Sequence, residues 1–486
     1  MTTEMQITLV ILGYMALTVV IGLLGNARKR KQKEKSNDEF LMAGKSLSPI
    51  VLAATLFAAN TGGASTMGVA NNVRTQGLSA AWWVIAAGVG FFLVSFIAPY
   101  FRRSSANTVP GIVGLRYGKA SHIFTAFTSI AALFMATGAQ VIATASIVSL
   151  LSGIDFTIAA VLTTAAVLLY TMFGGFKAVA SANTLHLLTI VFGMTIAMLL
   201  MVNHVGGFAT LFAQADYMSG TTPETVNLLS MSAVGVPAIF GFIAMYCFTF
   251  PTGQEIVQGY CSAKDARSAK LGSIIAAAIS AAYAIVPALI GLVAVSFIPG
   301  FLEEGGNAMA EATLAFSHPI IAGIVLASIV AATVSSASGN MIGTATMFTN
   351  DVFRPYINKG VQDNKKEVRV SQVTMLIVGL VALTVSIFAR NLISVMMMAF
   401  ALRSAGPFAA FICGLFYKNV TARAGFISIT VGTAIAVVWI FFLGTPFGLN
   451  AMVPGGVGAF VTIFLVSSID RKMGVKPLPM LTFDDN

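Results

Sequence analysis

Long apolar stretches alternate with short polar ones along almost the whole chain. About 20 consecutive apolar residues cross the hydrocarbon core of a bilayer, so each long stretch predicts a transmembrane helix. On this rule the sequence predicts about thirteen spans, at residues 6–25, 47–70, 78–100, 122–151, 154–173, 178–203, 234–258, 271–298, 319–350, 370–389, 392–416, 423–443 and 452–469. The fold class that follows is an all-α polytopic membrane protein.

Two of these spans contain helix-breaking residues near their centres. The second is interrupted by Asn60–Gly63, and the seventh by Phe248–Gly253, where a proline removes a backbone hydrogen bond. Unwound backbone at membrane depth is tolerated only where it lines a cavity or is covered by protein. Each broken span opens a set of five spans, and the two sets start from opposite sides of the membrane. This topology predicts a five-plus-five inverted repeat with a binding site where the broken helices meet.

The ninth span is rich in hydroxyl groups between Ile324 and Asn340. Ala332, Ser335 and Ser336 stand at i, i+3 and i+4, so they share one face of a helix. Two hydroxyls and a free carbonyl form an oxygen-only site that suits an alkali cation. The alternative is that small residues pack helices closely while the hydroxyls bond to their own backbone.

The same pattern divides the chain into five parts. An added amino-terminal helix and a basic cytoplasmic connector precede the first repeat, and an extracellular loop separates the two repeats. Two further helices and a short cytoplasmic tail follow the second repeat. The expected boundaries are 1–46, 47–203, 204–233, 234–417 and 418–486.

Composition and charge support this reading. With 57% hydrophobic and 9% charged residues and a mean hydropathy of +0.87, the chain fits no soluble class. The net charge of +10 comes from Lys and Arg that gather in alternate loops, which argues against nucleic acid as a partner. The positive-inside rule then predicts a multi-pass protein of the plasma (inner) membrane, with its amino terminus outside and its carboxyl terminus in the cytoplasm. Trp82 and Trp83 fall near the external interface, where an aromatic belt accounts for at least one of them.

Arg403 is a charged residue inside the eleventh span. It keeps its proton at neutral pH, and an arginine at a helix centre costs about 2.5–3.5 kcal/mol on insertion scales, so it needs a partner. None of the 18 acidic residues falls deep in a predicted span, and Glu255 follows the seventh-span break toward the cytoplasm. A structural role would pair Arg403 with backbone carbonyls, Glu255 or water. A functional role would pair it with an anionic group of a substrate.

The functional alternative predicts a small carboxylate-bearing solute, either a monocarboxylate or an amino acid. It also predicts that Arg403→Gln raises the KM for that solute while protein yield is kept. The scarcity of acidic residues at depth argues against a free cationic substrate.

Four sequence patches resemble those of the sodium/solute symporter family, which includes the bacterial proline, pantothenate, sialic acid and sodium/galactose symporters. The patches are DEFLMAGKSLSP followed by LFAAN, then YTMFGGFKAV, GQEIVQGYCSAKDARSAKLG and AATVSSASGNMIGTATMFTNDVFRPY. The resemblance implies a LeuT-type five-plus-five inverted repeat with added helices. It implies secondary active transport by alternating access, in which sodium is co-transported with a small organic solute.

The resemblance also implies the site residues. Sodium would be bound by the carbonyls of Ala58, Thr61 and Ala332 and the hydroxyls of Ser335 and Ser336. The substrate would lie beside the two helix breaks, near Asn60, Ser65, Tyr246 and Phe250.

Three positions depart from the family pattern. Ala182 and Asn183 stand where many relatives have Thr-Asp, His186 replaces a usual Gln, and Gln258-Gly259 replaces Gln-Arg. Some relatives use that Asp for a second sodium ion, so the neutral Asn183 predicts a single coupled sodium.

Other function classes fit the sequence less well. An enzyme is not expected, and a primary pump lacks its GxxxxGK[ST] loop. A channel does not need broken helices that meet at the midplane, and the tail after Lys476 is too short for a sensor's signalling module. Proton-coupled or uncoupled transport by the same fold is the main alternative. The oligomeric state stays open.

Overall fold

The computed structural model describes residues 37–219, 226–304, 306–389, 392–444 and 449–479, together with scattered residues between 6 and 20 and residue 446. Within these residues the structure is helical, apart from an isolated parallel bridge between Leu47 and Ala263. Half of the predicted first span and the basic stretch Arg28–Lys35 after it lie outside the described residues. The predicted external loop is described only on either side of residues 220–225.

The first half of the chain starts with a short helix, α2 (Asn37–Met42), and then enters the broken second span. Ser48 caps α3 and Pro49 occupies its first turn, which is a typical helix start. The elements in order are η1 (Ala43–Lys45), α3 (Pro49–Asn60), η2 (Ala64–Gly68), α4 (Val69–Gln76), η3 (Gly77–Ala81), α5 (Trp82–Val94), α6 (Ala98–Arg103), α7 (Val109–Tyr117), α8 (Lys119–Ser152), α9 (Phe156–Leu188), η4 (Thr189–Gly193), α10 (Met194–His204) and α11 (Gly207–Ser219).

The second half begins with the other broken span and ends with two added helices. Its elements are α12 (Val236–Thr252), α13 (Gln254–Cys261), α14 (Ala266–Tyr283), α15 (Ile285–Phe297), α16 (Phe301–Glu304), α17 (Ala308–Phe316), α18 (Pro319–Met347), η5 (Phe348–Ile357), α19 (Asn364–Phe388), α20 (Leu392–Ser404), α21 (Pro407–Phe416), α22 (Ala422–Phe441) and α23 (Met452–Lys472).

Every predicted span from 47–70 onward coincides with one or more of these helices. By length and composition, however, 8 described helices are long and apolar enough to cross a membrane, or up to 10 if each bent pair is one span. The first predicted span is only partly described and is not among these helices, and the rest of the difference from thirteen has physical causes. The second span is split into short pieces, its latter part runs on into the third, and the fifth contributes a shorter apolar helix before the chain kinks at Gly175.

Gly175 makes the turn between the predicted fifth and sixth spans, 154–173 and 178–203. Its φ is +67°, a conformation that favours glycine, and a Cβ there would lie 3.0 Å from the carbonyl oxygen of Phe40. The turn therefore divides α9 into two spans and lets the segment around α2 pack against it.

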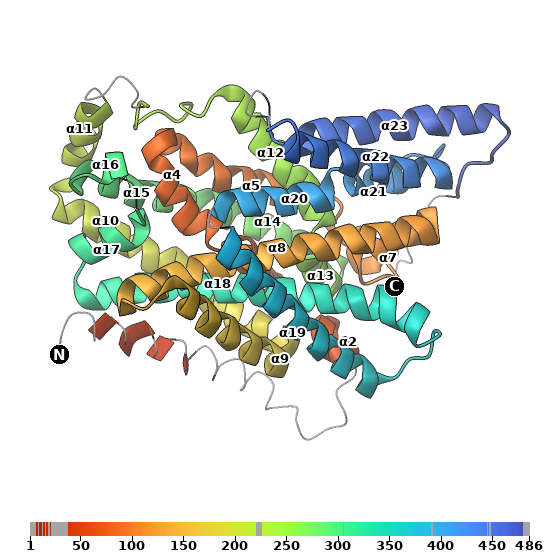
Figure 1. The fold of residues 1–486 in the computed structure, drawn as a ribbon, viewed down its shortest axis with the longest axis horizontal. Helices are drawn as coiled ribbons and strands as arrows, with labels where there is room; N and C mark the ends of the chain where they lie inside the picture. Colours follow the sequence, from red (N-terminus) through yellow and green to blue (C-terminus); the bar gives the residue numbers. More distant parts are fainter. Residues whose placement is uncertain are drawn as a thin grey trace.

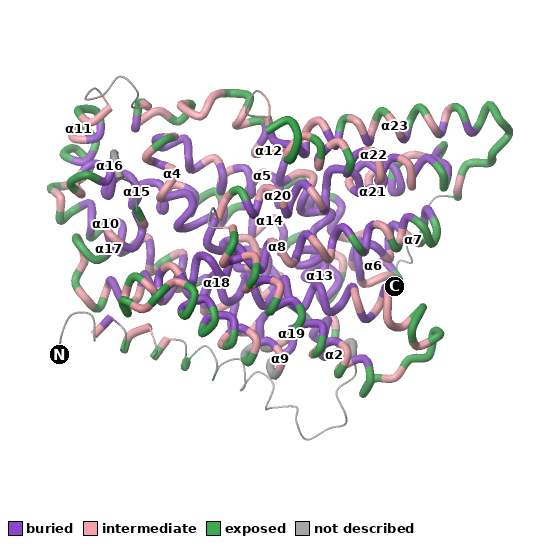
Figure 2. The backbone as a smooth tube through the Cα atoms, in the orientation of Figure 1, coloured by how far each residue is buried: buried purple, intermediate pink, exposed green. Residues whose placement is uncertain are grey.

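Helix α18 forms the centre of the molecule. It contacts α8, α9, α3 and α19, and 83% of its most apolar stretch is buried. Helices α8, α18 and α23 run along the long axis of the molecule (Figure 1). Buried residues concentrate around α18 and α13, whereas exposed residues occupy the outer sides of α9, α19 and α23 (Figure 2). Many of the exposed side chains are large and apolar, as expected of a surface that faces lipid.

Candidate functional site

The first helix break is covered by α8. Helix α3 ends at Asn60, and η2 begins at Ala64. The Gly63 N–H donates to the side-chain oxygen of Gln140, 2.9 Å away, so one of the backbone groups freed by the break is satisfied. A Cβ on Gly62 would lie 2.3 Å from that same oxygen. The glycines are therefore required by close packing, and the predicted interruption of the second span is confirmed.

The second break lies between α12 and α13, whose axes are bent by 53°. Pro251 sits in the last turn of α12, and Gly253 links the two helices. A Cβ on Gly253 would lie 3.0 Å from Nη2 of Arg403 and 3.0 Å from Oε1 of Glu255. The predicted interruption of the seventh span is thus also confirmed, and it lies directly against a pair of buried charges.

The two serines of α18 bond to other helices. The Ser336 hydroxyl donates to the carbonyl oxygen of Ala58 on α3, at 2.9 Å. The Ser335 hydroxyl donates to the side-chain oxygen of Asn183 on α9. By contrast, Ser328 and Ser338 on the same helix bond to their own backbone carbonyls four residues earlier. On the hydroxyl face predicted from the sequence, Ser336 is therefore directed toward the first break and Ser335 toward α9.

The remaining predicted sodium ligands lie in the same region. Ala332 is one turn before the two serines on α18, and Thr61 is the first residue after α3; both are completely buried. The hydroxyl of Thr61 has no hydrogen-bond partner among the described residues. A buried, oxygen-lined arrangement of this kind suits a hard cation that carries no preference for nitrogen or sulfur ligands.

Asn183 belongs to this cluster although the sequence marked it only as a departure from the family pattern. It is buried, and its amide oxygen accepts the Ser335 hydroxyl. His186 follows one turn later on α9, where its Nδ1 lies 3.0 Å from the Tyr14 hydroxyl. The local signal was a polar residue within an apolar stretch, but only the packing of α9 on α18 shows what it contacts.

Arg403 forms an ion pair with Glu255. Their nearest atoms, Nη1 and Oε2, are 2.6 Å apart, and the side chains are 2% and 8% exposed. The expectation that no acidic residue lies at this depth is wrong, because the bend at Gly253 turns the first residues of α13 toward α20. Of the two alternatives for Arg403, the structure contains the pairing with Glu255. The guanidinium also lies over the ring of Phe400, 4.9 Å from its centre.

The ion pair lines a small cavity of about 20 Å³, here named the ion-pair cavity. Three of the five predicted substrate residues line it: Asn60, Phe250 and Arg403. Ser65 and Tyr246 do not. Ser65 donates to the Asn60 carbonyl at 3.0 Å, and the ring of Tyr246 packs against Phe250 at 5.1 Å. The cavity wall also contains residues that the sequence did not single out as substrate contacts: Ala59, Ala136, Gln140, Glu255, Ile256, Asn340, Met396 and Phe400.

Comparison with known proteins decides the family. The sequence profile of the sodium:solute symporter family matches residues 40–432. The chain belongs to the sodium:solute symporter family. It is 23% identical over 459 residues to the osmoregulated proline transporter OpuE of Bacillus subtilis, with 91% of each chain covered. It is 24% identical over 500 residues to a sodium/proline symporter of Staphylococcus aureus, covering 96% of this chain and 94% of that one.

Solved structures confirm the fold of the symporter. A substrate-bound, outward-open Na⁺-coupled sialic acid symporter superimposes with a TM-score of 0.79 at 19% identity, over 98% of this chain and 99% of the other. The transporter MhsT, in complex with L-phenylalanine, gives a TM-score of 0.53 at 14% identity, over 87% and 97% of the two chains. The chain is therefore a multi-pass membrane protein with the LeuT-type architecture, and its function is sodium-coupled solute symport.

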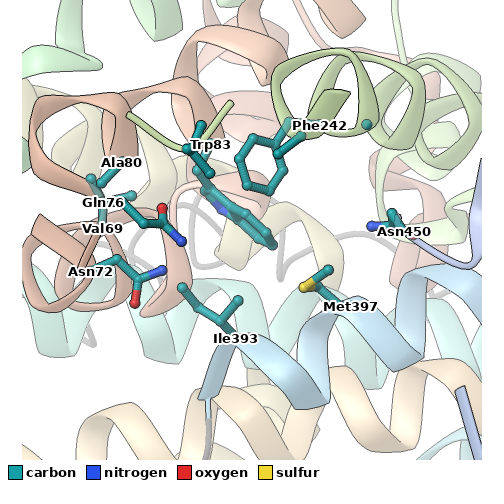
Figure 3. A pocket seen from close by; sticks show the side chains of 12 residues that line it. Val69, Asn72, Gln76, Ala80, Trp83, Phe242, Ile393, Met397 and Asn450 are labelled. Atoms are coloured by element: carbon teal, nitrogen blue, oxygen red, sulfur yellow. The ribbon is translucent and has the colours of Figure 1, made fainter. Parts of the chain in front are cut away.

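A second cavity of the symporter, of about 180 Å³, is here named the amide cavity (Figure 3). The amides of Asn72, Gln76 and Asn450 and the rings of Trp83 and Phe242 line it. Trp83 is 3% exposed, whereas Trp82 is more accessible and bonds to the Met231 carbonyl. Because Trp83 is buried, an interfacial belt does not account for it, and Trp82 stays the candidate for that role.

An aromatic partition separates the two cavities. Trp83 lines the amide cavity and Phe400 lines the ion-pair cavity. Their rings stack with centroids 6.4 Å apart and planes 18° apart. The ring of Tyr246 packs against both, at 5.9 Å from Trp83 and 6.1 Å from Phe400. The three rings, of Trp83, Tyr246 and Phe400, therefore form one contiguous aromatic cluster between the walls of the two cavities.

Asp351 joins distant segments at one end of the symporter. Its Oδ1 accepts the Thr108 hydroxyl at 2.8 Å and lies 2.9 Å from Nε2 of His122. Gln254 on α13 bonds to the same loop through the N–H of Val109 and the carbonyl of Asn107. The loop before α7 is thus bonded to both η5 and the second half of the broken seventh span.

We expect Asp351→Ala to destabilise the folded protein, because each buried donor left without an acceptor costs about 1–3 kcal/mol. The measurement is the melting temperature of the purified protein. Asp216→Ala, at an exposed position on α11, is the control and should melt as the wild type does. Equal melting temperatures for the two variants would show that the contacts of Asp351 contribute nothing to stability.

Proposed function

We propose that the chain carries a small carboxylate-bearing solute, a monocarboxylate or an amino acid, together with one sodium ion in each transport cycle. Sodium would be held by the carbonyls of Ala58, Thr61 and Ala332 and by the hydroxyls of Ser335 and Ser336. The observation that supports this set most strongly is the contact of Ser336 with Ala58, which joins α18 to the last turn before the first break.

The solute would bind beside the two breaks, where Asn60, Phe250 and Arg403 share one cavity wall. Ser65 and Tyr246 would stabilise that wall through their contacts with Asn60 and Phe250, respectively. The names of the relatives favour an amino acid over a monocarboxylate, since both are described as carriers of proline. Arg403 supplies the positive charge that a carboxylate requires.

The symporter would lie in the plasma membrane with its amino terminus outside and its carboxyl terminus in the cytoplasm. The basic loops support this orientation, because Lys and Arg collect on the cytoplasmic side of membrane proteins. Alternating access would then connect the ion-pair cavity to each side in turn.

We expect one sodium ion to be coupled to each solute molecule. Asn183 is neutral, so it supplies no carboxylate to offset a second buried cation, which is costly without a compensating charge. The measurement is the sodium dependence of uptake in proteoliposomes together with the ratio of sodium flux to solute flux. Asn183→Asp is the matched variant, and it should raise the apparent affinity for sodium because its carboxylate would face Ser335. A flux ratio near two in the wild type would contradict the expectation.

A further inference from the structure

The charge on the wall of the ion-pair cavity comes from two side chains. Among the described residues that line it, Arg403 and Glu255 ionise, and the others are amides or apolar groups. The two charges are buried and 2.6 Å apart, so the wall is neutral as a whole although it presents both signs. A cavity of this kind can bind either sign of charge, provided that the ion pair opens.

Two donors on this wall have no acceptor. Nε of Arg403 and Nδ2 of Asn60 are both buried and lack hydrogen-bond partners among the described residues. Buried donors are nearly always paired in native structures, so these two are available to an anionic oxygen that enters the cavity. Arg403 can therefore accept a second carboxylate, because its planar guanidinium has five N–H groups and pairs with carboxylates through two of them at once.

We propose that the Arg403–Glu255 pair opens to receive the zwitterionic head group of an α-amino acid. Arg403 and Asn60 bind the carboxylate, and Glu255 binds the ammonium. This inference rests on the proposed function, since it names the substrate class of the same site.

Leaving a buried charge without a partner costs free energy, so the site favours a zwitterionic solute over a solute that carries one charge. A monocarboxylate that drew Arg403 away would leave Glu255 buried without a partner, and a free amine would leave Arg403 in the same state. An uncharged solute offers no ionic partner to Arg403 or to Glu255, so the ion pair stays closed. Only a solute with both charges replaces each half of the pair with a new partner, so the site discriminates against analogues that carry one charge.

Phe400 links the opening of the Arg403–Glu255 pair to the entry of the solute into the ion-pair cavity. Its ring lies under the guanidinium of Arg403 and also stacks on Trp83 in the aromatic partition. A cavity of about 20 Å³ holds little more than one water molecule, so an amino acid enters only after the partition moves. Displacement of Phe400 would open the route and uncover the guanidinium in one step.

The test uses the purified full-length symporter and its melting temperature. Sodium alone should raise the melting temperature, because a ligand of the native state stabilises it. In sodium, the standard L-amino acids are then compared with pyrrolidine and cyclopentanecarboxylate, the single-charge analogues of L-proline. We expect one or more zwitterions to stabilise further, with each single-charge analogue of the best ligand about a hundredfold weaker or more.

The outcomes separate the two proposals. Absence of stabilisation by sodium itself would count against the sodium site of the proposed function. Stabilisation by sodium but by none of the amino acids would overturn the inference alone. The same holds if a carboxylate or amine that carries one charge binds as tightly as the corresponding amino acid.

Two variants test the roles of the charges. Glu255→Gln removes the ammonium partner and should lower the preference for the amino acid over its carboxylate analogue by about tenfold or more. Because this change leaves Arg403 unpaired, the neutral double variant Arg403→Gln/Glu255→Gln is measured beside it. The double variant should keep its stabilisation by sodium and lose its stabilisation by the amino acid. Equal weakening of both ligands in Glu255→Gln, or wild-type amino-acid binding in the double variant, would overturn the inference.

Discussion

Replacing Ser335 and Ser336 together with alanine is expected to weaken sodium binding by roughly a hundredfold or more. A hydrogen bond or ligand contact to a charged group contributes about 1.5–3 kcal/mol, and the double variant removes two such oxygens. Each 1.4 kcal/mol corresponds to about a factor of ten in affinity. Both hydroxyls are directed at neighbouring helices and not at the backbone of α18.

The measurement is the sodium concentration that gives half-maximal thermal stabilisation, followed by the sodium dependence of uptake. Ser328→Ala is the matched control, since Ser328 is a buried serine of the same helix whose hydroxyl bonds to its own backbone. It should leave the sodium dependence at its wild-type value. A double variant that titrates with sodium as the wild type does would remove both serines from the site.

Arg403→Gln alone is expected to destabilise the protein by about 3–5 kcal/mol, because it leaves Glu255 buried without a partner. The functional alternative for Arg403 predicted a milder result, a raised KM with protein yield intact, because it paired Arg403 with the substrate and not with Glu255. Because of the ion pair, we expect Arg403→Gln to lower the protein yield. The expected increase in KM for a carboxylate-bearing solute stays a prediction.

The neutral double variant distinguishes charge from packing. Arg403→Gln/Glu255→Gln removes both charges and keeps hydrogen-bonding groups at both positions, so most of the lost stability should return. The measurements are the melting temperatures and expression yields of Arg403→Gln, Glu255→Gln and the double variant. Together with the wild type they form a double-mutant cycle. If the double variant is as unstable as Arg403→Gln, the effect comes from lost packing against Phe400 and not from an unpaired carboxylate.

The helix breaks and the hydroxyl face could be predicted because their signals are local. Asn60–Gly63 and Pro251 are poor helix residues in apolar spans, and Ser335 and Ser336 share a face by helical periodicity alone. The structure brings two of the predicted sodium ligands, Ser336 and Ala58, into contact, and sodium binding there stays a prediction. In each of these cases the property depends on residues within one or two turns.

The sequence indicated Glu255 as one of several partners for Arg403 but could not decide among them, because the pairing depends on an angle between helices. Glu255 follows the break by two residues, and the 53° bend between α12 and α13 decides whether it faces α20 or the cytoplasm. Nothing in the local pattern sets that angle. Trp83 is a similar case, since its position in the chain suggests an interface, while its stacking on Phe400 depends on how α5 and α20 are packed.

The most direct test of the account is equilibrium binding of radioactive sodium to the purified symporter without added solute. We expect saturable binding that approaches one ion per protein molecule, that Ser328→Ala preserves and that Ser335→Ala/Ser336→Ala weakens by roughly a hundredfold or more. Binding of equal affinity and stoichiometry in the wild type and the double variant would contradict it, and so would the absence of saturable sodium binding in the wild type.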